Sequence, residues 1–190
     1  MFRPRLLCTF GPTLSIARYL DRLLQPIYDQ MASTTTFHKG ADAVHALELY
    51  KQKGLLKPTT HFATLHIDHL HTMFPHKETI QALEHFLHDH GFNGHIQGLT
   101  INTIVQLVRL ILRNQYFIYD NRLFQQMKGG GPGAPLTALL ADIYMLYWQQ
   151  NLVSILNEKN ELFGRYDFFI VLLPIISYTH LFIDVRISLS

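Results

Sequence analysis

The sequence is short of cysteine and charge, and its basic residues are dispersed. Its 190 residues contain one cysteine, Cys8, which excludes a disulfide within the chain and suits a reducing compartment. We therefore expect an intracellular protein of the nucleus or cytoplasm. Charged residues make up 16%, the formal net charge is +2, and the basic residues run from Arg3 to Arg186 without a tight cluster. Composition alone thus does not indicate a nucleic-acid-binding protein.

The sequence also lacks a long uninterrupted apolar run, an internal repeat and a low-complexity segment. Its N-terminal stretch has basic residues but no long apolar core before a cleavage site, so no signal peptide is predicted. Near the C-terminus, Pro174 and His180 interrupt a very apolar segment, whose part without a polar side chain is only Phe168–Ile176. A membrane span needs about 20 mostly apolar residues. We expect a buried strand or an aberrant tail there, and no membrane partner.

Apolar residues make up 48% of the chain, enough for one medium domain with a real core. Their helical spacing, with turn and cap residues, predicts five helices. Pro26 is expected to end or kink the first, Gly54 to close the second and Thr100 to cap the fourth. The predicted helices cover residues 15–30, 40–54, 77–90, 100–114 and 135–157.

Two segments have the residue pattern of β-strands. Residues 62–70, "FATLHIDHL", form one, and residues 115–128 form a hairpin around Asp120-Asn121, a pair typical of tight turns. In the last helix we expect Leu139, Ile143 and Leu146 to point inward. The order of the elements predicts an α+β fold with helices packed on a small antiparallel sheet.

A glycine-rich segment, "GGGPGAPL" (129–136), precedes the last predicted helix. Exposed N–H groups at a helix N-terminus suit phosphates or a nucleic-acid strand, and glycines let a base pair or another backbone approach closely. The segment lacks the Lys-Ser/Thr ending of a Walker A loop, which disfavours that type of ATP hydrolysis. Seen alone, such a stretch is most often an ordinary flexible loop.

Five segments, in order and with consistent spacing, resemble the reverse transcriptase domain of Penelope-like retroelements between about residues 2 and 166. They correspond to the family's fingers segment, the approach to its first catalytic motif, that motif, its hairpin with the second motif, and the segment before its third. In this sequence they read "FRP…GPTLSIARYLDRLLQPIYD", "TTTFHKGADAVHALELY", "LKPTTHFATLHIDHLHTMFPH", "FIYDNRLFQQMKGGGPGAPLTALLADIYMLYW" and "ELFGRY".

The resemblance implies a right-hand polymerase fingers–palm fragment, without a thumb, from an RNA-directed DNA polymerase lineage. Such an enzyme adds dNTPs to a DNA primer along an RNA template. It uses two Mg²⁺ ions roughly 3.5–4 Å apart. In the family, these ions are held by one Asp of the first motif and an Asp pair of the third. The implied partners are therefore an RNA template, a DNA primer and dNTPs; the oligomeric state is left open.

This sequence departs from the family at the first motif. Matching the "LHTMFP" segment (70–75) to the family pattern places His66 where the metal-binding Asp is expected. Imidazole is a poor Mg²⁺ ligand, because Mg²⁺ prefers oxygen donors in octahedral geometry. Asp68 is the other candidate ligand. It lies about 6.5–7 Å further along the predicted strand, so its use would require a bulge or a two-residue slip.

The second motif keeps more of the family's pattern. Gln126, Gly129 and Gly133 match it, and we expect them to line the nucleotide and template pocket. The resemblance places His71 on the aromatic position that screens the nucleotide sugar. It also relates Arg3 to a fingers residue near the triphosphate.

The third motif has no Asp pair. After Tyr166 the sequence continues "DFFIVLLPIISYTHLFIDVRISLS", with Asp167 alone before apolar residues. We predict a reverse transcriptase-like fingers/palm fragment over residues 1–166 and an aberrant apolar tail over 167–190. A change of reading frame or exon boundary near Tyr166 would explain the tail, and its "FFIVLL" segment would cover a sheet edge by strand pairing. We expect little or no polymerase activity.

Two alternatives remain. The chain is a non-catalytic nucleic-acid-binding remnant if basic residues such as Arg3, Arg5, Arg18 and Lys128 still hold a duplex, with weak and salt-dependent affinity. It is a transition-metal-binding protein if its histidines and Asp68 converge.

The metal alternative has little support in the predicted periodicity. In a strand, His66 and Asp68 share one face, whereas His69 and His71 share the other. His85 and His88 stand at i, i+3 on a predicted helix, where histidines are most often solvent-facing.

Overall fold

The structure, a computed structural model, describes residues 11–58, 60, 63–67, 69–91, 93–131, 133–166 and 169–173. The chain divides into two compact units. Unit 1 holds the described residues of Met1–Met31 and His69–Trp148, and unit 2 those of Ala32–Asp68 and Gln149–Ser188.

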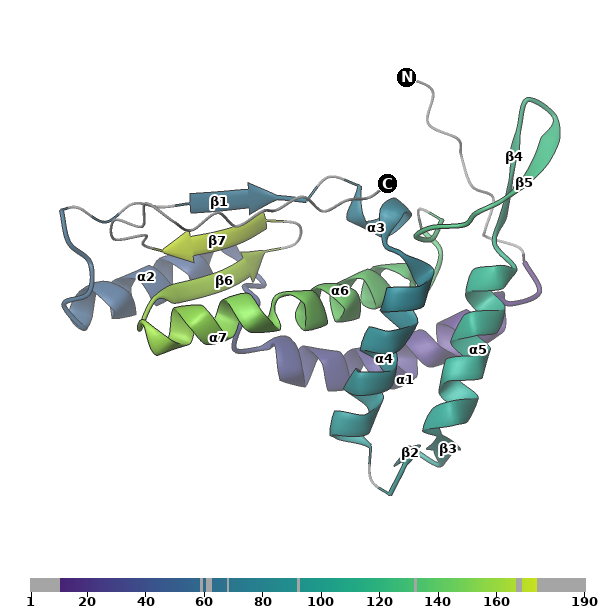
Figure 1. The fold of residues 1–190 in the computed structure, drawn as a ribbon, viewed down its shortest axis with the longest axis horizontal. Helices are drawn as coiled ribbons and strands as arrows, with labels where there is room; N and C mark the ends of the chain where they lie inside the picture. The colour runs from purple at the N-terminus through teal and green to yellow at the C-terminus, as the bar shows by residue number, and fades with distance from the viewer. Residues whose placement is uncertain are drawn as a thin grey trace. The chain divides into compact units, whose positions relative to one another are not determined.

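Unit 1 is mainly helical, and in it α4 packs against both α5 and α6 (Figure 1). Its core includes Leu83 and Leu87 of α4, Ile104 of α5, and Leu139 and Ile143 of α6, all fully or almost fully buried. The helices are α1 (Leu14–Ala32), α3 (Leu70–Met73), α4 (His76–His90), α5 (Ile101–Arg113) and α6 (Thr137–Trp148). Two antiparallel hairpins complete it: β2 (His95–Ile96) with β3 (Leu99–Thr100), and β4 (Tyr116–Tyr119) with β5 (Arg122–Gln125).

Unit 2 is built on a three-stranded antiparallel sheet in the order β1-β7-β6. The strands are β1 (Ala63–His66), β6 (Leu162–Tyr166) and β7 (Phe169–Leu173), and the helices α2 (Gly40–Gln52) and α7 (Gln150–Glu158) contact β6. In the register, both His66 and Tyr166 lie opposite Phe169. The apolar segment after Tyr166 therefore supplies a central strand, with partners on both sides.

Several local predictions are confirmed. The Thr100 side chain accepts a hydrogen bond from the Thr103 N–H at 3.1 Å and so caps α5. Asp120 and Asn121 both have positive φ, 48° and 55°, as a two-residue hairpin turn requires. Gly54 follows α2 with φ +71°, the left-handed geometry that typically ends a helix.

Pro26 does not end its helix, which was one of the two outcomes expected of it. Helix α1 continues for six residues beyond it. Pro26 itself is exposed, whereas Tyr28 and Ala32 beyond it are buried on the same face as Leu20 and Leu24. A proline inside a helix costs about 3 kcal/mol, and continued burial of this apolar face offsets that cost.

The strand predicted over residues 62–70 is shorter in the structure, because β1 ends at His66 and Leu70 already begins α3. His69 adopts the left-handed region, with φ 58°. The turn lets Leu70 and Phe74, which are 3% and 0% exposed, enter the core. The assignment of His69 and His71 to a common strand face is therefore wrong.

The long helix predicted over residues 135–157 is two helices, α6 and α7. The break is at Gln149, which is 1% exposed and donates from Nε2 to the Thr35 hydroxyl at 3.4 Å. Within α6, Leu139 and Ile143 are buried as expected, but the next buried position is Met145 and Leu146 is half-buried. In the described part of the chain, no helix has both the length and the apolar character needed to cross a membrane.

Candidate nucleic-acid interface

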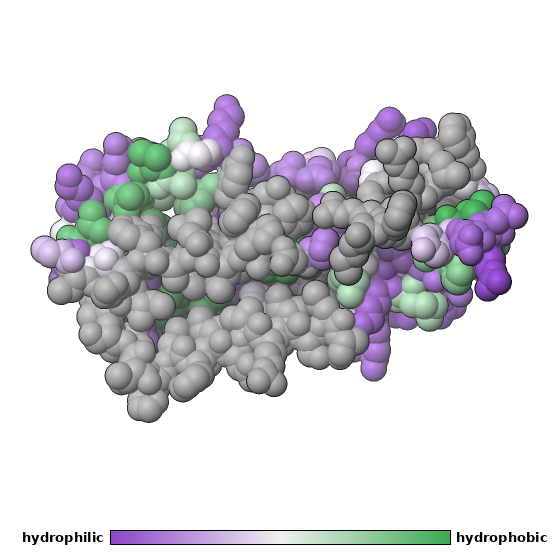
Figure 2. Space-filling view, turned by 90° about the horizontal axis from the view of Figure 1, so that it is seen from above, coloured by the Kyte–Doolittle hydropathy of each residue, from purple (hydrophilic) through white to green (hydrophobic). Residues whose placement is uncertain are grey.

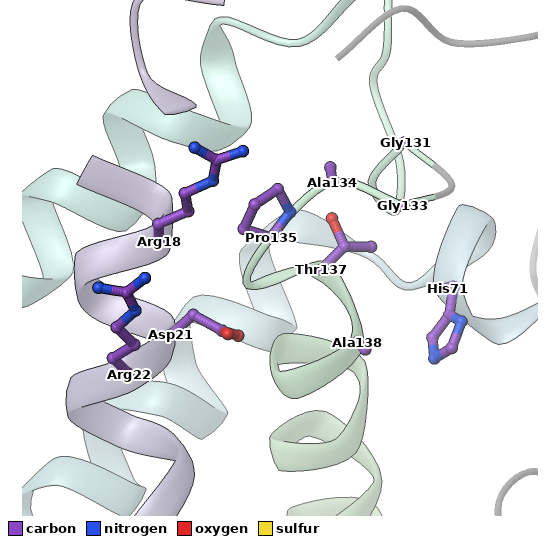
Figure 3. Close-up of a pocket in the computed structure, with 10 residues that line it drawn as sticks. All are labelled: Arg18, Asp21, Arg22, His71, Gly131, Gly133, Ala134, Pro135, Thr137 and Ala138. Carbon is purple, nitrogen blue, oxygen red and sulfur yellow. The ribbon is translucent and has the colours of Figure 1, made fainter. Parts of the chain in front are cut away.

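Unit 1 contains a cavity of about 500 Å³ between α1, the glycine segment and the start of α6 (Figure 3). Helix α1 contributes two arginines and one aspartate, and α3 contributes His71. The remaining lining comes from residues 131–138. In full, the lining residues are Arg18, Asp21, Arg22, His71, Gly131, Gly133, Ala134, Pro135, Thr137 and Ala138.

Arg18, Asp21 and Arg22 stand at i, i+3 and i+4 of α1 and therefore share one face of the helix. Both arginines are exposed. Figure 3 shows their guanidinium groups projecting from α1 toward the same side, with the Asp21 carboxylate turned toward α6. Two adjacent guanidinium groups with five N–H donors each match phosphate oxygens in charge and geometry.

Asp21 has a structural role at this site. Its Oδ1 accepts a hydrogen bond from the Leu136 N–H at 3.2 Å, immediately before α6. Leu136 is buried and has φ +70°, a conformation that bulky residues rarely adopt. Asp21 therefore fixes α1 to the N-terminus of α6, where it satisfies one N–H that the helix itself leaves unpaired.

The glycine segment does not offer a free row of N–H groups, as the phosphate-binding interpretation required. Gly129 N–H donates to the Phe74 carbonyl at 2.7 Å, and Gly130 N–H to the His71 carbonyl at 2.8 Å. Gly131 N–H donates to Oε1 of Gln115 at 3.2 Å. Because these three N–H groups bind protein oxygens, they are not available to a phosphate.

The glycines instead permit close packing, the other reason considered for them. Gly129 has φ +60°, and a Cβ there would overlap the backbone of Thr72. A Cβ on Gly130 would overlap the Thr137 side chain. The His76 ring nitrogen Nε2 lies 2.7 Å from the Gly129 carbonyl oxygen, which further ties the segment to α4. The segment therefore packs directly against the α3 turn.

The described residues that were predicted to bind nucleotide or template fall into two groups. His71 and Gly133 line the cavity. Gln126 lies at the base of the β4–β5 hairpin, 9% exposed, where its Nε2 donates to the Lys128 carbonyl at 2.9 Å. Gln126 and Gly129 therefore position the glycine segment and are not part of the cavity wall. Gln126 Oε1 is buried without a hydrogen-bond partner.

Sequence reasoning named Arg18 only as a general basic contact and missed Asp21, Arg22 and Thr137 as part of this site. The available signal was the helical spacing of Arg18, Asp21 and Arg22, which places the two arginines beside the buried face of α1.

Unit 2 holds the backbone position that the resemblance assigns to the first metal-binding Asp. His66 is the last residue of β1 and lies opposite Phe169, which in turn lies opposite Tyr166. Only Asp167 and Phe168 separate Tyr166 from Phe169 in the sequence. The last residues of β1 and β6 therefore flank the same residue of β7, Phe169. Arg3, Asp68, Asp167 and the side chain of His66 lie outside what the structure describes.

The side chains at these positions do not fit the two-Mg²⁺ centre implied by the family. Mg²⁺ requires carboxylate or other oxygen ligands, and His66 brings an imidazole to the first position. Among the described residues, no three His, Cys, Asp or Glu side chains converge in a way that could hold a metal ion. His85, considered for a transition metal, stacks on Tyr147 with ring centroids 5.2 Å apart.

No protein-family model matches the chain, and no curated protein matches it. Solved structures do. A telomerase from Candida tropicalis truncated from its C-terminal domain superposes with a TM-score of 0.66 at 13% identity, over 85% of this chain and 34% of that one. Telomerase from Candida albicans, solved with a TWJ fragment of telomeric RNA, gives 0.61 at 13% identity, over 90% and 31%. Apo telomerase from Candida tropicalis gives 0.62 at 10% identity, over 90% and 32%.

The fold is reverse-transcriptase-like. The mixed arrangement of helices and a small sheet resembles part of a telomerase reverse transcriptase, and the chain spans about a third of the length of the telomerase chains it matches. At 10–13% identity the likeness concerns the fold alone. It agrees with the reverse-transcriptase class that the five sequence segments indicated.

Proposed function

We propose that this chain is a fingers–palm fragment of a reverse transcriptase of the Penelope-like lineage, which binds a template–primer duplex but has little or no nucleotidyl transfer activity. The observation that carries the proposal is the cavity in unit 1, where Arg18 and Arg22 stand beside a close-packed glycine segment. The reverse-transcriptase-like fold and the order of the five sequence segments support the lineage.

The partners in this proposal are an RNA template and a DNA primer, held through their phosphates, in the nucleus or cytoplasm. Arg18 and Arg22 provide charge without base recognition, so the affinity is independent of sequence and falls steeply with salt. His71, on the opposite side of the cavity, is the candidate contact to a nucleotide sugar.

The proposed lack of nucleotidyl transfer activity follows from the residues at the expected metal-ligand positions in unit 2. In the lineage, two Mg²⁺ ions activate the primer hydroxyl and stabilise the leaving pyrophosphate. Here the position of the first carboxylate is His66, at the end of β1, and the two residues between Tyr166 and Phe169 include only one acid, Asp167. The absence of an Asp pair supports the proposed inactivity.

A primer-extension assay on an RNA template with Mg²⁺ and dNTPs tests the catalytic part. We expect no extension above background. Robust incorporation that is abolished by Asp68→Ala but survives His66→Ala would overturn the proposed inactivity and show that Asp68 is the metal ligand.

Binding of a labelled RNA–DNA duplex tests the other part. Arg18→Ala combined with Arg22→Ala should weaken binding at least tenfold at low salt and lower the slope of log affinity against log salt by about 1–2. The control is Lys51→Ala combined with Lys53→Ala, two exposed residues at the end of α2, which removes the same charge. Equal losses in the two double variants would reduce the interaction to non-specific charge attraction.

A further inference from the structure

The β4–β5 hairpin exposes an unusual amount of apolar surface. Its side chains and those just beyond it include six large hydrophobic residues that are each at least 41% exposed. Among the described residues the two strands pair only with each other, so the hairpin is not part of a larger sheet. Contiguous exposed apolar surface typically marks an interaction site. These residues are Tyr116, Ile118, Tyr119, Leu123, Phe124 and Met127.

The register sorts these side chains onto two different faces, because residues directly opposite each other in an antiparallel pair share a face. Phe117 lies opposite Phe124, and Tyr119 opposite Arg122, on what we call the aromatic face. Ile118 lies opposite Leu123 on the other, which we call the aliphatic face. Tyr116 and Gln125 also belong to the aliphatic face.

Ring contacts organise the aromatic face. Phe117 and Phe124 are stacked, with centroids 5.5 Å apart and an interplanar angle of 20°. Tyr119 meets Phe124 edge-on at 6.4 Å. The rings are held across two strands whose base is tied to α5, because Gln125 Nε2 donates to the Arg113 carbonyl at 2.8 Å. The face is thus an organised platform that exposes ring surface.

The charge around the hairpin is complementary to nucleic acid. Residues 113–128 contain three basic side chains, Arg113, Arg122 and Lys128, and one acid, Asp120. Arg122 lies on the aromatic face itself, opposite Tyr119. In Figure 2, hydrophobic and hydrophilic side chains lie side by side at the right-hand end, where Figure 1 draws the hairpin.

We propose that the aromatic face, formed by Phe117, Tyr119, Arg122 and Phe124, binds an unpaired single strand of nucleic acid by base stacking. Aromatic side chains combined with basic ones are the usual means of holding single strands without sequence preference. The hairpin leads directly into the glycine segment, which lines the arginine cavity. The bound strand is therefore the single-stranded extension of the duplex, so this inference rests on the proposed function.

Fluorescence anisotropy of the full chain with a labelled single-stranded RNA and with a blunt RNA–DNA duplex tests this inference. Tyr119→Ala combined with Phe124→Ala should weaken binding of the single strand by roughly tenfold or more. Blunt duplex binding should stay within about twofold. The matched control, Ile118→Ala combined with Leu123→Ala, removes side chains of the opposite face and should change neither affinity.

A second measurement, tryptophan fluorescence, uses a variant that keeps an aromatic side chain at position 124. In Phe124→Trp the ring is retained, and stacking of a base should quench the new indole beyond any change seen for Trp148 in the unaltered chain. Single-strand binding that is lost equally in both face variants, or in neither, overturns the inference. So does a hairpin tryptophan that single strands leave unquenched.

The outcome can be separated from that of the proposed function. If Arg18→Ala with Arg22→Ala leaves duplex binding intact while the aromatic-face variant loses the single strand, the cavity proposal fails and the hairpin inference stands. If the aliphatic-face variant alone changes behaviour, by abolishing self-association in light scattering, the hairpin is a protein-binding element and the inference is wrong.

Discussion

The glycine segment of unit 1 and the sheet of unit 2 differ in how far their residues match the family pattern that the sequence resembles. Around the glycine segment, backbone hydrogen bonds from Gly129 and Gly130 reach the α3 turn, and the glycines themselves are required by close packing. In the sheet, the described strands pair in a defined antiparallel register, yet His66 stands at the position that the family resemblance gives to a carboxylate.

This difference shows that the strand register and the proposed metal chemistry depend on different residues. The register of β1, β7 and β6 consists of backbone pairing, which many apolar residues allow. A two-Mg²⁺ centre depends on a few carboxylates that no other side chain replaces. A chain can therefore keep a reverse-transcriptase-like fold while the residue at a position expected to hold a metal ligand changes.

The largest effect is expected for Gly129→Ala in unit 1. The new methyl group would overlap the Thr72 backbone at a positive φ, so the free energy of unfolding should fall by about 3 kcal/mol or more. Urea denaturation followed by the fluorescence of Trp148, which lies in α6, measures it. Gly94→Ala is the control, since Gly94 has φ +73° but open space around it, and it should cost only about 1–2 kcal/mol. Similar losses for the two variants would contradict the close-packing argument.

In unit 2 the corresponding change is Gly164→Ala on β6. A Cβ there would overlap the ring of Phe37, and we expect a loss of about 2 kcal/mol because the ring must shift. Hydrogen exchange of the β6 amides would report it. Gly40→Ala, with open space at the start of α2, should leave exchange unchanged. Unaltered protection of the β6 amides in Gly164→Ala would show that the sheet tolerates an added Cβ, in contrast to the expectation for Gly129 in the glycine segment.

Tyr50→Phe tests the polar interior of unit 2. The Tyr50 hydroxyl donates to Glu161 Oε2 at 2.9 Å, and burial, together with this carboxylate, raises the pKa of Tyr50 to about 12. The variant should lose about 1 kcal/mol near neutral pH. Because the folded chain favours the neutral phenol, this contribution is complete below about pH 10 and disappears as the pH rises through about 12.

Denaturation midpoints across that alkaline range provide the measurement for Tyr50→Phe. Tyr19→Phe, at a half-exposed position of α1, is the control and should lie within about 0.5 kcal/mol of the unaltered chain. A difference between Tyr50→Phe and the unaltered chain that grows with alkaline pH would have the wrong sign for this explanation.

The smallest effect is expected at the N-terminus of α5. Thr100→Ala removes the oxygen that accepts the Thr103 N–H, and unit 1 should lose about 0.5–1 kcal/mol in the Trp148-detected transition. Thr100→Ser retains the acceptor and should behave like the unaltered chain. If serine and alanine are equally destabilising, the cap is not the cause.

Much of the local structure follows from the sequence alone. Thr100, Gly54 and Asp120-Asn121 act through hydrogen bonds and backbone angles that involve only near neighbours, so α5, the end of α2 and the β4–β5 turn were predicted. The reverse-transcriptase-like fold was also predictable, because five segments of the sequence resemble the family pattern in order and spacing. The continuation of α1 past Pro26 was not, because burial of Tyr28 and Ala32 outweighs a local rule.

The candidate site depended on tertiary structure for the same reason. The sequence determined that Arg18, Asp21 and Arg22 share a helix face, but it did not bring that face to residues 131–138. It supplied the glycines, whereas only the fold decided that their N–H groups bind the α3 turn and Gln115 instead of a phosphate. Contacts between residues distant in the chain depend on packing of the whole unit, and one-dimensional spacing does not contain that information.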